Sequence, residues 1–172
     1  AVYTRYLKQL LDEGIDTVSS SEIAEAADVD AAKMRKDLDY FGEFGTRGVG
    51  YKVDELYGHL LKILGLHRIR NVILLGAGRL GSALALYPGF ADWGFRINTI
   101  IDVDPQKIGK PLGKVVIEGL EGLERKIGER DIEIAIISVP GCEAQGLADR
   151  LVAAGIKAIL NFSPQVLKVP EK

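Results

Sequence analysis

The stretch VILLGAGRLGSAL, residues 72–84, joins a short apolar run to a glycine-rich turn and then to a helical pattern. The turn fits the pattern G-x-G-x-x-G, formed by Gly76, Ala77, Gly78, Arg79, Leu80 and Gly81. After a strand, such a turn lets the backbone approach a pyrophosphate at the N-terminus of the next helix. The stretch therefore predicts the start of a dinucleotide-binding domain.

The chain around this turn alternates between apolar runs and helical segments from Arg70 onward. The runs are rich in Val and Ile and cover residues 71–75, 96–101, 115–117, 132–139 and 158–162. Such alternation is typical of a parallel sheet covered by helices. We expect an α/β fold with a Rossmann-type parallel sheet domain over residues 71–172.

Asp102 ends the second run, about 20 residues beyond Gly81. A carboxylate there can accept hydrogen bonds from the adenosine ribose hydroxyls and would repel a 2′-phosphate. The pair of features favours NAD(H) over NADP(H). The alternative is that Asp102 only begins the turn Asp102-Val103-Asp104-Pro105.

Residues beyond other strand ends are further cofactor candidates, because ligands of open α/β sheets bind outside the carboxyl ends of the strands. These candidates are Ser138, Val139, Pro140, Asn161 and Phe162, together with Tyr87 after the glycine helix. Pro140 is equally explained as a turn former, and Tyr87 as a packing residue.

The N-terminal part, residues 1–70, carries helical patterns. A helix over residues 2–12 ends before Gly14, and Ser19 and Glu22 have the spacing of a capping box. Asp30 is a candidate N-cap for a helix over residues 31–41, which with residues 20–27 has helix-turn-helix proportions. Asp54 is expected to cap a connecting helix that ends at Gly65.

The second helix of this pair has two distinct faces. Met34, Leu38 and Phe41 share the face expected to pack inward. The outward face carries Lys33, Lys36 and Tyr40, with Arg35 beside it. These basic side chains are candidates for contacts with the DNA major groove and phosphates. Considered without the segment that follows it, this helix is explained equally well as a solvated surface on which Asp37 and Asp39 are counter-charges.

The following segment, GEFGTRGVGY over residues 42–51, places glycines between aromatic and basic residues. This predicts a β-hairpin, which after a helix-turn-helix forms a wing. Arg47 at its tip is a candidate for the minor groove, where narrow A·T stretches concentrate negative potential. A winged helix can also bind protein.

Composition sets further bounds. The 172 residues are 47% hydrophobic and 27% charged, with a formal net charge of -2, so DNA binding requires a local basic patch. Cys142 is the single cysteine and the histidines are His59 and His67, so we expect neither an intramolecular disulfide nor a metal site. The apolar runs are short and the N-terminus lacks a signal-peptide pattern, which favours the cytoplasm.

The chain also lacks an evident arrangement of proton donors for hydride-transfer chemistry. A cofactor pocket without catalytic side chains suggests that the cofactor is sensed and not used in catalysis. A second hypothesis is an NAD-dependent oxidoreductase with an accessory winged helix. A third is a protein-binding adaptor that uses NAD(H) as a structural ligand.

The sequence resembles the Rex family of bacterial redox-sensing transcriptional repressors over nearly its whole length. The similar blocks, in order, are RKDLDYFGEFGTRGVGYKV, GAGRLGSALALYPGF, DVDPQKIGK, SVPGCEAQ and AGIKAILNFSP. The resemblance implies an N-terminal winged-helix DNA-binding domain, an NAD(H)-binding Rossmann domain and a homodimer. It also implies that NADH releases the repressor from operator DNA while NAD+ competes for the same site.

The resemblance carries roles to particular positions. Lys33, Arg35, Lys36 and Arg47 match the DNA-reading helix and wing, and Gly76, Gly78, Gly81 and Asp102 match the dinucleotide site. Tyr87 matches a tyrosine near the nicotinamide, and Arg5 an arginine that couples the domains through an acidic residue of the partner subunit. Family members continue into a C-terminal helix exchanged between subunits, which would follow Lys172. Without that helix we expect weaker dimerisation and switching.

Overall fold

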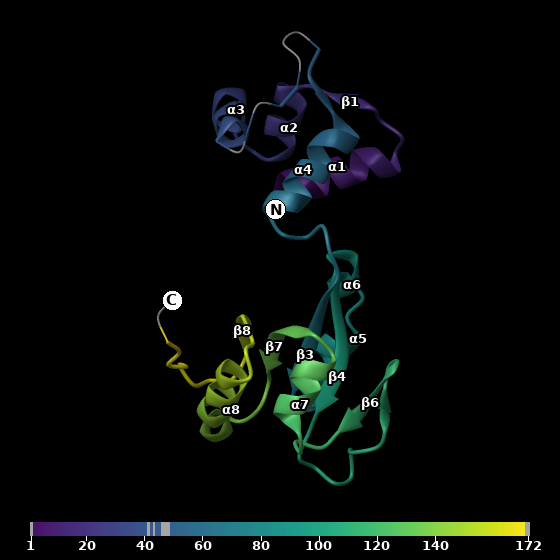
Figure 1. Cartoon of the computed structure of the whole chain (residues 1–172). Coiled ribbons are helices and arrows are strands. Elements are labelled where there is room, and N and C mark those ends of the chain that lie inside the picture. The colour runs from purple at the N-terminus through teal and green to yellow at the C-terminus, as the bar shows by residue number, and fades with distance from the viewer. Residues whose placement is uncertain (1, 41, 43, 46–48, 171–172) are drawn as a thin grey trace. The chain divides into compact units, whose positions relative to one another are not determined.

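The computed structural model describes residues 2–40, 42, 44–45 and 49–170. The chain divides into two compact units, Ala1–Arg68 and Ile69–Lys172 (Figure 1). The sequence pattern predicted the corresponding boundary after residue 70.

The first unit is a helical bundle with a small antiparallel sheet. Its elements are α1 (Val2–Asp12), β1 (Thr17–Val18), α2 (Ser20–Ala26), α3 (Ala31–Asp39), β2 (Tyr51–Lys52) and α4 (Val53–Ile63). One core holds the four helices together, and its fully buried side chains include Leu7, Ile23, Met34, Leu38 and Val53. Met34 and Leu38 thus face inward as predicted, while Phe41 lies outside the described residues.

Local capping explains where these helices begin. Ser19 and Glu22 form the predicted capping box at α2, and the Asp30 carboxylate accepts the N–H groups of Ala32 and Lys33 at α3. The prediction for Asp54 was wrong. Helix α4 begins directly after β2 with Lys52 at the N-cap, so Asp54 lies in the first turn.

A strand pair absent from the sequence analysis anchors the wing. Val18 pairs with Tyr51 and Thr17 with Lys52, so β2 joins the segment between α1 and α2. Residues 43 and 46–48 of the predicted hairpin lie outside the described residues, so the hairpin stays a prediction, while its last residue, Tyr51, lies in β2 and pairs with a strand far upstream.

The second unit is built on a six-stranded sheet. Its elements are β3 (Arg70–Leu75), α5 (Arg79–Leu86), α6 (Gly89–Asp92), β4 (Phe95–Ile101), β5 (Pro111–Leu112), β6 (Val115–Glu118), α7 (Leu123–Glu129), β7 (Ile132–Ile137), α8 (Gly141–Ala153) and β8 (Ala158–Asn161). The strand order is β5-β6-β4-β3-β7-β8. All neighbours are parallel except β5 and β6, which form an antiparallel edge hairpin that the sequence analysis missed.

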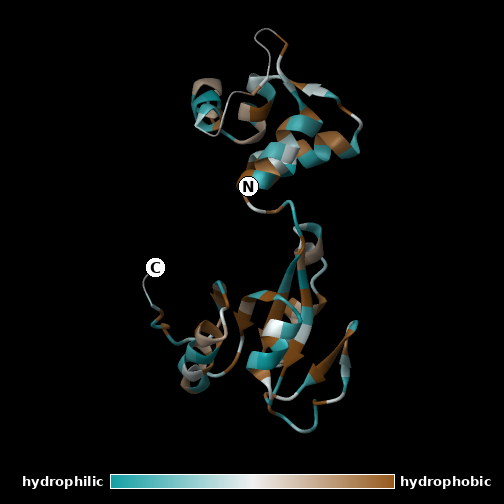
Figure 2. Cartoon of the chain, viewed as in Figure 1, coloured by the Kyte–Doolittle hydropathy of each residue, from teal (hydrophilic) through white to brown (hydrophobic). Residues whose placement is uncertain are grey.

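Alternate residues of the central strands pack on opposite faces of this sheet. Ile73 and Leu75 belong to a core with α7 and α8, whereas Val72 and Leu74 belong to a core with α5 and α6. Figure 2 shows hydrophobic residues along the strands and mixed colours on the helices. Burial on both faces explains why the strands appear in the sequence as continuous apolar runs.

Candidate nucleotide site and nucleic-acid interface

The glycine turn links β3 to α5, and its three glycines meet different constraints. Gly76 has a φ of +96°, and a Cβ there would lie 2.6 Å from the carbonyl oxygen of Ser138. A Cβ on Gly81 would overlap the carbonyl oxygen of Gly76. A Cβ on Gly78 would meet no atom within 4 Å. Gly76 and Gly81 are thus required by conformation and packing, while Gly78 leaves the backbone open to a ligand.

The adjacent strand β7 forms the other side of this position. Leu75 is in register with both Ile101 and Ile137, so three strands end at the same edge of the sheet. Ser138 follows β7, and its hydroxyl donates to the carbonyl oxygen of Gly76 at 2.8 Å. Strand order reverses between β3 and β7, and this switch point is where open α/β sheets bind ligands.

Asp102 lies at the same edge, at the end of β4, and is only 9% exposed. Its Oδ2 accepts the N–H of Ala77 at 2.7 Å, and its Oδ1 accepts the N–H of Asp104 at 2.9 Å. Lys107 Nζ donates to Oδ2 at 3.1 Å. Burial alone raises the pKa of the Asp102 carboxyl, but these donors outweigh it, and the pKa lies below the ordinary value for Asp. An ionised carboxylate is therefore held against the glycine turn.

These residues border a cavity of about 430 Å³, within the size range of small-molecule and cofactor sites. The predicted residues that line it are Gly76, Gly78, Asp102, Ser138, Val139 and Pro140. The cavity is also lined by residues that the sequence analysis did not select, namely Leu75, Ile101, Val103, Lys107, Leu120, Glu143 and Leu147. Leu75, Ile101 and Leu147 lie in strands or a helix, whereas Val103, Lys107 and Leu120 reach the cavity from the loops that follow β4 and β6.

The other predicted cofactor residues are not among those that line this cavity. They are Ala77, Arg79, Leu80, Gly81, Tyr87, Asn161 and Phe162. Tyr87 is 60% exposed and packs edge-on against Phe90. The Asn161 side chain donates to the carbonyl of Gln165 and accepts the N–H of Ser163, so it organises the turn after β8. Roles for these side chains toward a cofactor stay predictions.

The helix-turn-helix surface lies on the first unit. Lys33, Arg35, Lys36 and Tyr40 of the α3 segment are all exposed, opposite the buried Met34 and Leu38. The Arg35 guanidinium donates to the hydroxyl of Ser20 in α2, at 3.3 Å. The exposed basic face is thus carried on a helix whose inner face is fixed by the core.

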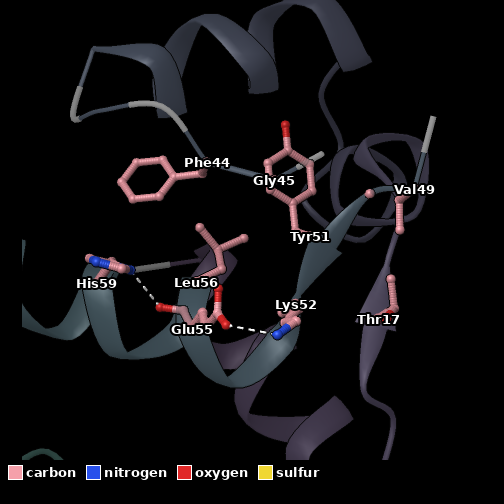
Figure 3. Close-up of a pocket in the computed structure, with 10 residues that line it drawn as sticks. Thr17, Phe44, Gly45, Val49, Tyr51, Lys52, Glu55, Leu56 and His59 are labelled. Carbon is pink, nitrogen blue, oxygen red and sulfur yellow. Dashed lines mark hydrogen bonds and ion pairs between the residues drawn. The ribbon is translucent and has the colours of Figure 1, made fainter. Parts of the chain in front are cut away.

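The base of the wing packs on α4 (Figure 3). The Phe44 ring lies 5.3 Å from the His59 ring, and both border a cavity of about 380 Å³ with Leu56 and Tyr51. A Cβ on Gly45 would lie 2.7 Å from the carbonyl oxygen of Gly50, so the arms of the loop approach closely. Arg47, the predicted tip residue, lies outside the described residues.

Arg5, predicted to couple the domains, is exposed on α1. Its neighbour Tyr3 donates a hydrogen bond to Asp37 in α3 at 2.8 Å. Helix α1 therefore contacts the candidate recognition helix directly.

The described parts of the chain contain neither a metal-ligand cluster nor a membrane-spanning helix. Within residues 2–40, 42, 44–45 and 49–170, no three or more His, Cys, Asp or Glu side chains are grouped to hold a metal ion. No helix in those same segments has the length and apolar character needed to cross a membrane.

Two family models match the chain. Residues 67–165 match a family described as CoA binding domain, and residues 1–39 match one described as putative DNA-binding protein N-terminus. The two matched ranges fall on the α/β unit and the helical unit respectively.

Closely similar proteins extend over nearly the whole chain. The redox-sensing transcriptional repressor Rex of Syntrophomonas wolfei is 60% identical over 99% of this chain and 81% of its own. A crystal structure of RSP, a Rex-family repressor, with β-NAD+ and operator DNA has a TM-score of 0.92. RSP in that structure is 46% identical over 98% of this chain and 78% of its own. RSP with β-NADH has a TM-score of 0.86 at 44% identity, with the same coverage.

The fold and the two sites define a transcription regulator with a winged helix-turn-helix unit and a Rossmann-type nucleotide unit. The predicted fold class is confirmed by the similarity to RSP. At 60% identity over 99% of its length to a named relative, the chain belongs to the Rex family of redox-sensing transcriptional repressors.

Proposed function

We propose that this chain is a repressor that binds operator DNA and is released when NADH occupies its Rossmann unit, with NAD+ competing for that site. The observation that carries the proposal is the similarity to RSP, whose structures contain β-NAD+ with operator DNA in one case and β-NADH in the other. The open Gly78 backbone and the ionised Asp102 beside it support a dinucleotide site in this chain.

The DNA-reading surface in this proposal consists of Lys33, Arg35 and Lys36 of α3 together with Arg47. The α3 residues are exposed on one helix, which suits the major groove and its phosphates. Arg47 is proposed for the minor groove.

The nucleotide surface consists of the glycine turn and the residues facing it. Gly76 to Gly81 receive the pyrophosphate, and Asp102 accepts the ribose hydroxyls and disfavours a 2′-phosphate. Ser138, Val139 and Pro140 border the remaining ligand, toward which Tyr87, Asn161 and Phe162 are further candidates.

The proposed working form is a homodimer in the cytoplasm, where its DNA and NAD(H) are present. Two recognition helices then read two half-sites, and Arg5 contributes to coupling through an acidic residue of the partner subunit. The curated relatives are named as transcriptional repressors, which favours a regulator over an oxidoreductase.

Binding to the RSP operator duplex, titrated with NADH and NAD+ at one stated salt concentration, tests the proposal. We expect NADH to weaken binding and NAD+ to oppose this effect. Binding insensitive to NADH would favour an adaptor or a simpler DNA-binding factor. Steady consumption of NADH with a small carbonyl substrate would favour an oxidoreductase.

A further inference from the structure

Lys107 is the basic side chain among the residues that line the nucleotide cavity. Its Nζ lies 3.1 Å from Asp102 Oδ2 and 3.8 Å from Asp104 Oδ2. The Lys107 side chain is 37% exposed, so its ammonium group lies where the cavity meets solvent. The Asp102 carboxylate, which is proposed to bind the ribose hydroxyls, is thus paired with the Lys107 ammonium at the edge of the cavity.

The acceptor sites of Asp102 are nearly filled by the protein itself. A carboxylate offers about four lone-pair sites, and the described donors are the N–H of Ala77, the N–H of Asp104 and Lys107 Nζ. One ribose hydroxyl can bind the remaining site on Oδ1. A second must displace Lys107 from Oδ2, so the lysine is the movable member of this group.

We propose that Lys107 forms a latent site for a 2′-phosphate, which Asp102 masks in the wild-type protein. This inference rests on the proposed NAD(H) site. With Asp102 present, its negative charge neutralises the ammonium and repels a phosphate. Without Asp102, the ammonium faces the cavity and can donate to phosphate oxygens.

Asp104 limits the size of this effect. Its Oδ2 stays within 3.8 Å of Lys107 Nζ, while its Oδ1 accepts the N–H of Gln106 and fixes it in the turn. Loss of Asp102 therefore leaves Asp104 beside Lys107, and Glu143 also lines the cavity. We expect a gain in NADPH preference of about tenfold, at the low end for a hydrogen bond to a charged group.

The test is calorimetric titration of NADH and NADPH into wild type, Asp102→Ala, Lys107→Ala and the double variant. Lys110→Ala is the matched control, because Lys110 is exposed on the same loop and does not line the cavity. In the Asp102→Ala background, Lys107→Ala should abolish the gain in NADPH preference, whereas Lys110→Ala should preserve it.

Asp102→Asn is a second background, since its amide oxygen can still accept the Ala77 N–H and hold the turn. Equal NADPH preference with and without Lys107, in either background, would overturn the inference. The absence of a gain in both backgrounds would overturn it as well. Failure of the wild-type protein to bind NADH would instead contradict the proposed function.

Discussion

The hydroxyl of Tyr3 in α1 donates a 2.8 Å hydrogen bond to the carboxylate of Asp37 in α3. Burial raises the pKa of Tyr3 to about 12, and both the hydrogen bond to Asp37 and the negative charge of Asp37 act in the same direction. The contact connects the helix that carries Arg5 to the helix that carries Lys33, Arg35 and Lys36. It stabilises the first unit only while the phenol is protonated.

This contact predicts a pH-dependent loss of stability. The raised pKa means that the folded state holds the Tyr3 proton more tightly than the unfolded state, whose pKa is near 10. The contribution is present below pH 10 and is lost as pH rises toward about 12. Tyr3→Phe should lower the free energy of unfolding by about 1 kcal/mol at pH 7.

Urea unfolding of wild type and Tyr3→Phe at several pH values measures this difference. The two proteins should converge in stability between pH 10 and about pH 12. A difference that stays constant over that interval would show that the Tyr3–Asp37 bond does not control the titration.

The glycine turn predicts a separation between folding and binding. Gly81→Ala places a methyl group against the carbonyl oxygen of Gly76 and should cost about 1–3 kcal/mol of stability. Gly78→Ala places it in open space, with a φ of -75° that alanine accepts, so stability should change by less than about 1 kcal/mol. Gly78→Ala should nevertheless weaken NADH binding, because the methyl group occupies the ligand side.

Thermal unfolding and NADH titration of both variants check this separation. An unfolded Gly78→Ala would contradict the open space around this position, and a folded Gly78→Ala with wild-type NADH affinity would show that this glycine does not face the nucleotide.

The exposed basic face of α3 predicts a salt-dependent DNA affinity. Removing a single phosphate contact with Lys33→Ala or Lys36→Ala should reduce the slope of log affinity against log salt by about 1. NADH affinity of the free protein should stay unchanged. Lys62→Ala, an exposed lysine in the last turn of α4, is the control. A slope equal to that of wild type would exclude the mutated lysine from the phosphate contacts.

Much of the fold could be predicted because local signals were strong. The continuous apolar runs marked the central strands, and Ser19, Glu22 and Asp30 marked helix starts through side-chain bonds that the structure contains. The features that were missed depend on contacts distant in sequence. Pairing of β1 with β2 joins strands of two residues, too short to show a period.

Three misses differ in their origin. Asp54 is not the cap of α4, because the Val53 N–H already bonds to the carbonyl of Asp16 and the helix begins earlier. The β5–β6 hairpin was overlooked although Gly113, with a φ of +62°, begins its two-residue turn. Lys107 could not be selected from spacing, since it reaches Asp102 through a turn held by that carboxylate.

Arg5 carries a prediction about coupling. Arg5→Ala should leave the NADH affinity of the free protein and the operator affinity without nucleotide close to wild type. It should reduce the factor by which NADH weakens operator binding, because Arg5 is proposed to couple the two sites without contacting either ligand. Gel-shift titrations at fixed salt measure all three quantities. An unchanged factor would remove Arg5 from the coupling.

The central claim is that the nucleotide and operator sites are linked, and linkage is reciprocal. The most direct measurement is the NADH dissociation constant with and without saturating operator duplex. We predict that DNA raises this constant by about 5- to 150-fold, by the same factor that saturating NADH weakens operator binding. Identical NADH affinity in the free and DNA-bound protein would contradict the account.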